Sequence, residues 1–231
     1  MAVAQTAYAN RQHYRMVTTW LPHLLTNSLS LLLPDLVRAL FAPRYRPRTL
    51  IEDTLITMVR DNPRYAVYVA PLAVGYILSH PRFNIYKGAI GDLRVGGMGL
   101  DAIPHSATAF TFSVLVADTF DTMGKREQYR DVLARFVQWG SQNPEVASLL
   151  FLALITLNWE YGEYRVHEYE LALKGDASLI NLQWSMQDTL RDVGANLFGW
   201  FTAMLWRRTQ TRRTSARRIP ASGSSVYNPR A

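Results

Sequence analysis

The amino-acid sequence predicts an all-α membrane protein, a polytopic bundle of four or five spans with a short amphipathic helix on the cytoplasmic side. Two observations favour this fold class. Several stretches of the chain lack Asp, Glu, Lys and Arg, and the basic residues gather in alternate connections between those stretches. Signals for β-strands are sparse throughout, so helices are the expected elements.

Five uncharged stretches are the candidate spans. The first, residues 16–34, contains Pro22, His23 and Asn27, and it is equally compatible with a helix that lies in the membrane interface. The other four are residues 65–79, 102–117, 146–159 and 193–206. A straight spanning helix needs about 20 residues, and the last three reach that length only together with neighbouring polar motifs. Buried helices of a soluble bundle would fit such runs as well.

The distribution of basic residues favours the membrane alternative. If all five stretches span, one side holds residues 35–64, residues 121–145 and the tail after residue 206, with most of the 25 Lys and Arg residues. This asymmetry follows the positive-inside rule and places the C-terminal tail in the cytoplasm. Within the second of these segments, residues 125–139 carry apolar side chains at helical intervals, which predicts the amphipathic helix.

Composition divides the chain into three parts. Residues 1–63 form an N-terminal arm with one apolar or interfacial helix, residues 64–206 form the membrane bundle, and residues 207–231 form a disordered basic tail. The absence of cysteine excludes a disulfide scaffold, a thiolate metal site and a Cys nucleophile. The N-terminus is a poor match to a signal peptide, so we expect it to be retained.

The basic tail predicts contact with anionic lipid head groups. Its arginines follow directly after the last candidate span, where each basic side chain adds about 1 kcal/mol of attraction to such a surface. They are Arg207, Arg208, Arg212, Arg213, Arg217 and Arg218. Nucleic acid would also attract a chain of net charge +7, but no aromatic residues alternate with the basic ones to stack on bases.

Three polar motifs carry the candidate site. They read Asp-x-x-x-His, Trp-Glu-x-x-Glu and Asp-Thr-x-x-Asp-x-x-x-Asn-x-x-Gly, with spacings of three or four residues that place each set on one helix face. In the predicted topology all three motifs reach the extracytoplasmic side. The candidate ligand-binding residues are therefore Asp101, His105, Glu160, Glu163, Asp188, Asp192 and Asn196.

The chemistry of this set leaves several alternatives open. Five carboxylates cannot all stay ionised unless a cation, His105 or Arg191 compensates them. Carboxylates with one imidazole suit a hard or borderline divalent cation. They equally suit proton sharing, hydrogen bonds to a sugar or an amine, or a packing network between helices. The motifs assign no catalytic residue, no particular metal and no cofactor.

The order and spacing of the three motifs resemble the VanZ-like and YjdF-type bacterial membrane proteins, over roughly residues 64–206. The resemblance implies a small helical protein of the bacterial inner membrane whose biochemical activity is not established. It directs attention to the cell envelope, because some VanZ-like members are associated with glycopeptide resistance.

These observations lead to two main functional expectations. The first is an integral membrane protein whose polar cluster binds or handles an envelope ligand, either a lipid-linked head group or a cation. The alternative is a non-catalytic accessory subunit of a larger membrane complex. A metal-assisted hydrolase that acts on a lipid substrate comes third, so the enzyme question stays open.

Overall fold

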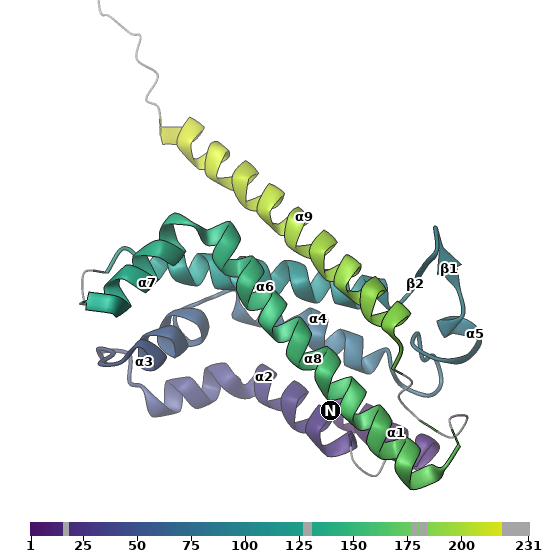
Figure 1. Ribbon diagram of the computed structural model, residues 1–231. Coiled ribbons are helices and arrows are strands. Elements are labelled where there is room, and N and C mark those ends of the chain that lie inside the picture. The colour runs from purple at the N-terminus through teal and green to yellow at the C-terminus, as the bar shows by residue number, and fades with distance from the viewer. Residues whose placement is uncertain (16–18, 127–130, 177–179, 181–183, 219–231) are drawn as a thin grey trace, which may run out of the picture.

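The computed structural model describes residues 1–15, 19–126, 131–176, 180 and 184–218, with the side chains of residues 131 and 211–218 excepted. Within this part of the chain the protein is helical apart from one small hairpin (Figure 1). The elements are α1 (Ala2–Tyr14), α2 (Trp20–Leu40), α3 (Leu50–Leu55), the π-helix η1 (Ile56–Arg60), α4 (Tyr65–Ile77), α5 (Gly88–Gly91), β1 (Arg94–Val95), β2 (Met98–Gly99), α6 (Ala102–Met123), α7 (Asp131–Gln142), α8 (Pro144–Lys174) and α9 (Met186–Arg218).

The predicted all-α character is confirmed, but the polytopic membrane bundle is wrong. None of the helices in the described residues combines the length and the apolar character that a membrane span requires. Helix α4 is strongly apolar but has only 13 residues, fewer than the about 20 that a span needs. Helices α2 and α6 are longer, yet Ser, Thr, Asn and His side chains interrupt their apolar runs.

The predicted spans differ from the helices in their bounds as well. Residues 146–159 and 193–206 are internal parts of α8 and α9, which have 31 and 33 residues. The membrane sidedness depended on the spans, so the inner-membrane location and the cytoplasmic tail stay predictions. The predicted amphipathic helix at residues 125–139 corresponds to α7, which begins at Asp131, and residues 127–130 lie outside the described part.

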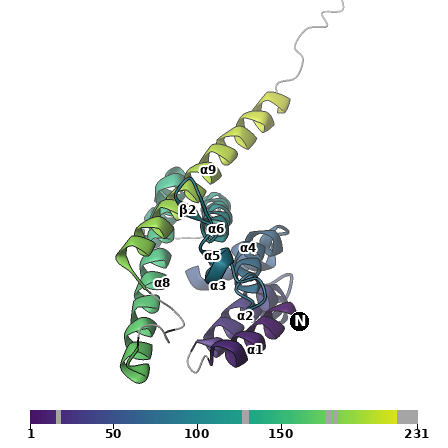
Figure 2. The same ribbon diagram turned by 90° about the vertical axis from the view of Figure 1, so that its right-hand side faces the viewer.

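Helix α6 is the central element. Helices α4, α7, α8 and α9 all pack against it, and α1 and α2 pack against α4 (Figure 2). The side chains of Val114 and Ala117 on α6 are completely buried. The main core cluster joins α6 to α2, η1, α4 and α9; its buried members are Val37, Val59, Tyr65, Tyr68, Val114, Leu115, Ala203 and Met204.

Local sequence signals explain where the helices around the site begin and end. Asp101 precedes α6, and its Oδ1 accepts a hydrogen bond of 3.0 Å from the backbone N–H of Ala102, which satisfies one of the free donors at the helix start. Pro144 opens α8, a position where the missing N–H costs nothing. Gly175 ends α8 in the left-handed conformation, with φ 68°.

Helices α6 and α9 cross at very close range. A Cβ atom added at Gly199 would collide with the backbone oxygen of Ser106 and would lie 2.9 Å from the Cβ of Ala109. The hydroxyl of Ser106 also donates a hydrogen bond of 3.0 Å to the carbonyl of Ala195. The glycine at the end of the third motif therefore allows α9 to approach α6, and this approach brings the start of α6 close to the N-terminal half of α9.

Candidate functional site

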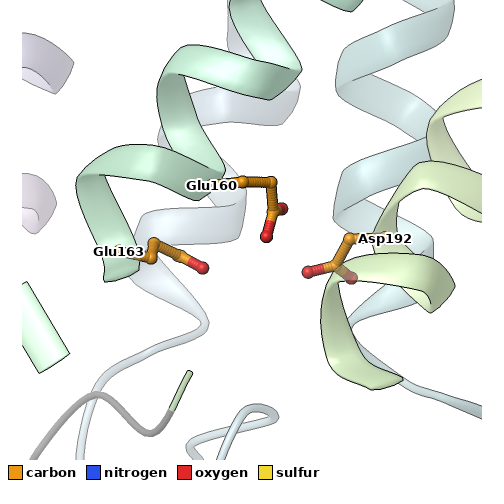
Figure 3. A group of neighbouring side chains, drawn as sticks. All are labelled: Glu160, Glu163 and Asp192. Atoms are coloured by element: carbon orange, nitrogen blue, oxygen red, sulfur yellow. The ribbon is translucent and has the colours of Figure 1, made fainter. Parts of the chain in front are cut away.

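Three carboxylates from two helices converge at the centre of the candidate site. Glu160 and Glu163 lie on α8, one turn apart, and Asp192 lies on α9 (Figure 3). One oxygen of each group lies within 4.8 Å of the others. Glu160 and Asp192 are only 8% and 6% exposed, and Glu163 is half-buried. We call these three residues the carboxylate cluster.

His105 completes the cluster from a third helix. Its Nε2 lies 3.6 Å from Oδ1 of Asp192, too far for a good hydrogen bond. Burial lowers the pKa of His105, against the opposing effect of the negative charges of Asp101, Glu160 and Asp188. The imidazole is therefore neutral at physiological pH and offers a nitrogen lone pair.

The structure brings Asp101 and Asp188 near the same place. Asp101 caps α6, and its charge raises the pKa values of both Asp188 and Asp192. Burial is the main cause of the raised pKa of Asp188, while Arg191, His105 and Arg94 act against it. These two carboxylates surround the cluster without belonging to the group whose oxygens lie within 4.8 Å.

Asn196 forms a contact between α8 and α9. Its Nδ2 donates a hydrogen bond of 3.1 Å to the hydroxyl of Thr156 on α8. This bond joins α8 to α9 one helical turn away from Asp192. Asn196 thus links two helices. The other six residues selected from the sequence lie close together, either in contact or near enough for the charge of one to act on another.

Burial and mutual repulsion keep protons on the cluster at neutral pH. Burial raises the pKa of Asp192 to about 8, with further contributions from the negative charges of Asp188, Glu160, Asp101 and Glu163. The pKa of Glu163 rises to about 7, again mainly through burial and then through Glu160. Among the described residues, no Lys or Arg forms an ion pair with any member of the carboxylate cluster.

Hydrogen bonds from neighbouring side chains orient two members of the cluster. The hydroxyl of Thr189 donates to Oε2 of Glu160 over 2.6 Å, and Nε1 of Trp159 donates to Oε1 of Glu163 over 2.8 Å. Such neighbours fix the direction of carboxylates that bind a ligand. Both residues stand inside the motifs, but no sequence signal distinguished them as partners of the carboxylates.

Tyr86 is a neighbour that the sequence analysis missed. Burial raises the pKa of its hydroxyl, and the charges of Asp101, Asp192 and Glu163 raise it further. The hydroxyl donates to the carbonyl of Gly75 over 3.1 Å. Tyr86 belongs to the connection between α4 and α5, where no spacing relates it to the motifs, so no sequence signal indicated it.

A separate polar cavity of about 450 Å³ lies near the other end of α6. Asp118, Asp121 and Arg126 contribute to its wall, but these charges already have partners. Arg207 pairs with both aspartates, and Arg126 pairs with the fully buried Asp53. We therefore regard the carboxylate cluster, and not this cavity, as the candidate site.

The basic tail is only partly described. Helix α9 continues through Arg218, so residues 207–218 are helical, and residues 219–231 lie outside the described part of the chain. Arg207 contacts Asp118 and Asp121, and Arg208 forms two hydrogen bonds with Glu145. The side chains of Arg212, Arg213, Arg217 and Arg218 also lie outside the described residues, and lipid binding by the tail stays a prediction.

Comparisons with family models, with curated proteins and with solved structures found no match. The resemblance to VanZ-like and YjdF-type proteins is therefore untested and stays a prediction, and the functional argument rests on the geometry of the site.

Proposed function

We propose that the protein binds a divalent cation through the carboxylate cluster, with His105 as an additional nitrogen ligand. The observation that carries this proposal is the convergence of three oxygens, from Glu160, Glu163 and Asp192, within 4.8 Å in a largely buried position. Repulsion between three carboxylates destabilises such an arrangement unless protons or a cation compensate it. A bound cation removes the repulsion and uses all three groups as ligands.

The spacing of the oxygens suits a metal ion of ordinary size. Oxygen ligands lie about 2.3–2.6 Å from Ca²⁺, so oxygens on opposite sides of such an ion are separated by about 5 Å. The carboxylate cluster falls within this separation without any change in the backbone. A smaller ion such as Mn²⁺ or Zn²⁺ would need the side chains to move closer together, because Zn²⁺ holds oxygen ligands at about 2.0–2.2 Å.

The imidazole narrows the choice of ion. Carboxylates alone suit Mg²⁺ and Ca²⁺, whereas imidazole suits Zn²⁺ and other transition metals. A neutral His105 beside Asp192 therefore favours a borderline ion such as Mn²⁺ or Zn²⁺ over Mg²⁺. The hydrogen bonds from Thr189 and Trp159 would hold the ligand carboxylates in place.

Calorimetric titration with Mn²⁺, Zn²⁺, Ca²⁺ and Mg²⁺ tests the proposal on the full chain at neutral pH. We expect stoichiometric binding of Mn²⁺ or Zn²⁺ that Asp192→Asn and Glu160→Gln weaken by about tenfold or more. Glu168→Gln is the matched control, because Glu168 is an exposed carboxylate on the same helix. Equal weakening by the control, or no binding to the unsubstituted protein, would reject the proposal.

Proton binding is the second candidate for the same residues. The pKa values of Asp192 and Glu163, about 8 and about 7, place both titrations near physiological pH. A cluster of this kind takes up and releases protons within the physiological range even without a metal ion. The calorimetric experiment separates the two functions, because proton binding alone gives no saturable heat with any of the four cations.

A lipid-linked ligand and a role as an accessory subunit, both expected from the sequence, stay predictions. A cation is the ligand that the geometry supports best, and neither a lipid-linked head group nor a role as an accessory subunit has comparable support in the described contacts.

A further inference from the structure

Helix α2 presents an unbroken row of leucines on its outer face. Their spacing of three or four residues places them along one side of the helix. Each is at least 45% exposed, and Leu40 reaches 75%. The members of this leucine row are Leu21, Leu25, Leu29, Leu32, Leu36 and Leu40.

The opposite face of α2 accounts for its attachment to the rest of the protein. Asn27 and Val37 are buried there, and Leu33 packs against the core cluster around α6. The ring of His23 stacks on Tyr76 of α4, with centroids 5.4 Å apart. Helix α2 is therefore held by one face, and the leucine row is the face that the described residues leave uncovered.

Arginines follow the leucine row directly. The connection after α2 contains Arg44, Arg46 and Arg48, all exposed, and Arg38 stands in the last turn of the helix. Arg38 pairs with Asp35 over 3.3 Å, whereas Arg44 and Arg46 form no ion pair with any residue that the structure describes. An apolar helix face and available positive charge thus occur side by side.

Helix α8 shows why this combination matters. It also exposes apolar side chains, among them Leu154 and Leu157. Arg208 pairs with Glu145 near the start of α8, and Arg165, within the helix, contacts the ring hydroxyl of Tyr161. Exposed apolar surface occurs at several places on the protein, and at α2 a continuous row of leucines is followed by Arg44 and Arg46. Helix α2 and α9 also lie on opposite sides of the molecule (Figure 1, Figure 2).

We propose that α2 docks on an anionic lipid surface, with the leucine row turned toward the acyl chains and Arg44 and Arg46 at the phosphate groups. A helix with one apolar face and adjacent basic residues binds in this orientation, parallel to the plane of the lipid layer. Basic residues near such a surface add attraction to anionic head groups. The proposal is independent of cation binding by the carboxylate cluster.

Charge favours a lipid surface over a second copy of the chain as the occupant. Two copies would each carry a net charge of +7, with Arg44 and Arg46 of both copies close to the contact. Like charges in that position oppose association, whereas a layer of anionic lipids supplies the opposite charge. The same argument predicts that added salt weakens the docking, because salt screens exposed charges.

The absence of cysteine allows a site-specific test on the full chain. Leu32→Cys and Leu157→Cys are labelled separately with an environment-sensitive fluorophore, and vesicles of phosphatidylcholine, with or without phosphatidylglycerol, are added. We expect a blue shift and a gain of intensity at position 32 only with the anionic vesicles, and no change at position 157. No change at position 32, or an equal change at both positions, would overturn the proposal.

Two further measurements test the alternative of a dimer and the role of the two arginines. Light scattering without lipid is expected to give a monomer, and a dimer that Leu29→Gln dissociates would instead assign the leucine row to a second copy. The double variant Arg44→Gln and Arg46→Gln changes exposed residues only, so the fold is retained. It should weaken binding to anionic vesicles by about tenfold or more, and unchanged binding would remove the proposed role of the arginines.

Discussion

Nε2 of His105 lies 3.6 Å from Oδ1 of Asp192, yet at neutral pH the two groups do not form an ion pair. Burial lowers the pKa of the imidazole and raises the pKa of the carboxyl group to about 8. The contact therefore joins a neutral imidazole to a protonated acid. A cation that displaces the proton gains an oxygen ligand and a nitrogen ligand at the same time.

The protonated state of Asp192 predicts a stability that falls as pH rises toward about 8 in the absence of metal. Unfolded Asp192 loses its proton near its ordinary pKa of 3.8, whereas the folded protein keeps the proton up to about pH 8. The folded state therefore binds more protons in this interval, and the free energy of unfolding decreases as pH rises. From about pH 6 to pH 8 we expect a loss of about 2 kcal/mol from this residue.

His105 has the opposite effect at lower pH. Its pKa is lowered in the folded state, so the unfolded state takes up a proton first and stability is lost as pH falls below the ordinary value of 6.5. Urea unfolding across this range, with a chelator present, measures both effects. In Asp192→Asn the decline above neutral pH should be smaller, and a profile parallel to that of the unsubstituted protein would contradict the account.

Cation binding should release protons. At pH 7 Asp192 holds its proton and Glu163 is about half protonated, according to their pKa values of about 8 and about 7. We expect roughly one to two protons released for each bound ion at neutral pH, and almost none in strongly alkaline buffer. Calorimetry in buffers of different ionisation enthalpy counts these protons, and zero release at neutral pH would argue against the carboxylate cluster as the ligand.

The close crossing of α6 and α9 predicts opposite effects at two glycines of the same helix. Gly199→Ala places a Cβ atom against the backbone of Ser106, and we expect a loss of about 1–3 kcal/mol of stability. Gly194→Ala is the matched control, because a Cβ atom there meets nothing within 4 Å and alanine favours a helix by about 0.5–1 kcal/mol. Urea midpoints of the two variants measure the difference.

The buried ion pair between α3 and the segment after α6 provides a further prediction. Asp53 is completely buried and pairs with Arg126. Arg126→Met leaves the carboxylate without this partner, which should cost about 3–5 kcal/mol of stability. The double variant Asp53→Asn with Arg126→Met should recover much of that loss, since no buried charge remains. A single variant as stable as the unsubstituted protein would show that the pair contributes nothing.

The grouping of the site residues followed from the sequence, although the topology used to derive it was wrong. Spacings of three and four residues placed each motif on one helix face. Asp101 is the N-cap of α6, and Asp192 lies in the second turn of α9. These two parts of the chain lie near each other because Gly199 lets the two helices cross closely. The second motif lies inside α8, not at its end, since α8 continues to Lys174.

The membrane spans could not be predicted correctly because an uncharged stretch is not equivalent to a spanning helix. In α6, Ser113 and Thr119 are buried, and the hydroxyl of Thr119 donates to the carbonyl of Leu115. Side chains of this kind bring no charge, so a count of charged residues does not register them.

The hairpin of β1 and β2 was also missed, although Gly96 and Gly97 provide the two positive φ angles that such a turn requires.

The most direct test of the proposed cation site is a crystal structure of the full chain with Mn²⁺, measured at a wavelength where manganese scatters anomalously. We predict one anomalous peak between Glu160, Glu163 and Asp192, within bonding distance of an oxygen of each, and a clearly lower peak in crystals of Asp192→Asn at the same Mn²⁺ concentration, chosen near the dissociation constant of the unsubstituted protein. A structure at saturating Mn²⁺ with no peak at the cluster, or a peak of equal height in the variant at the lower concentration, would contradict the account.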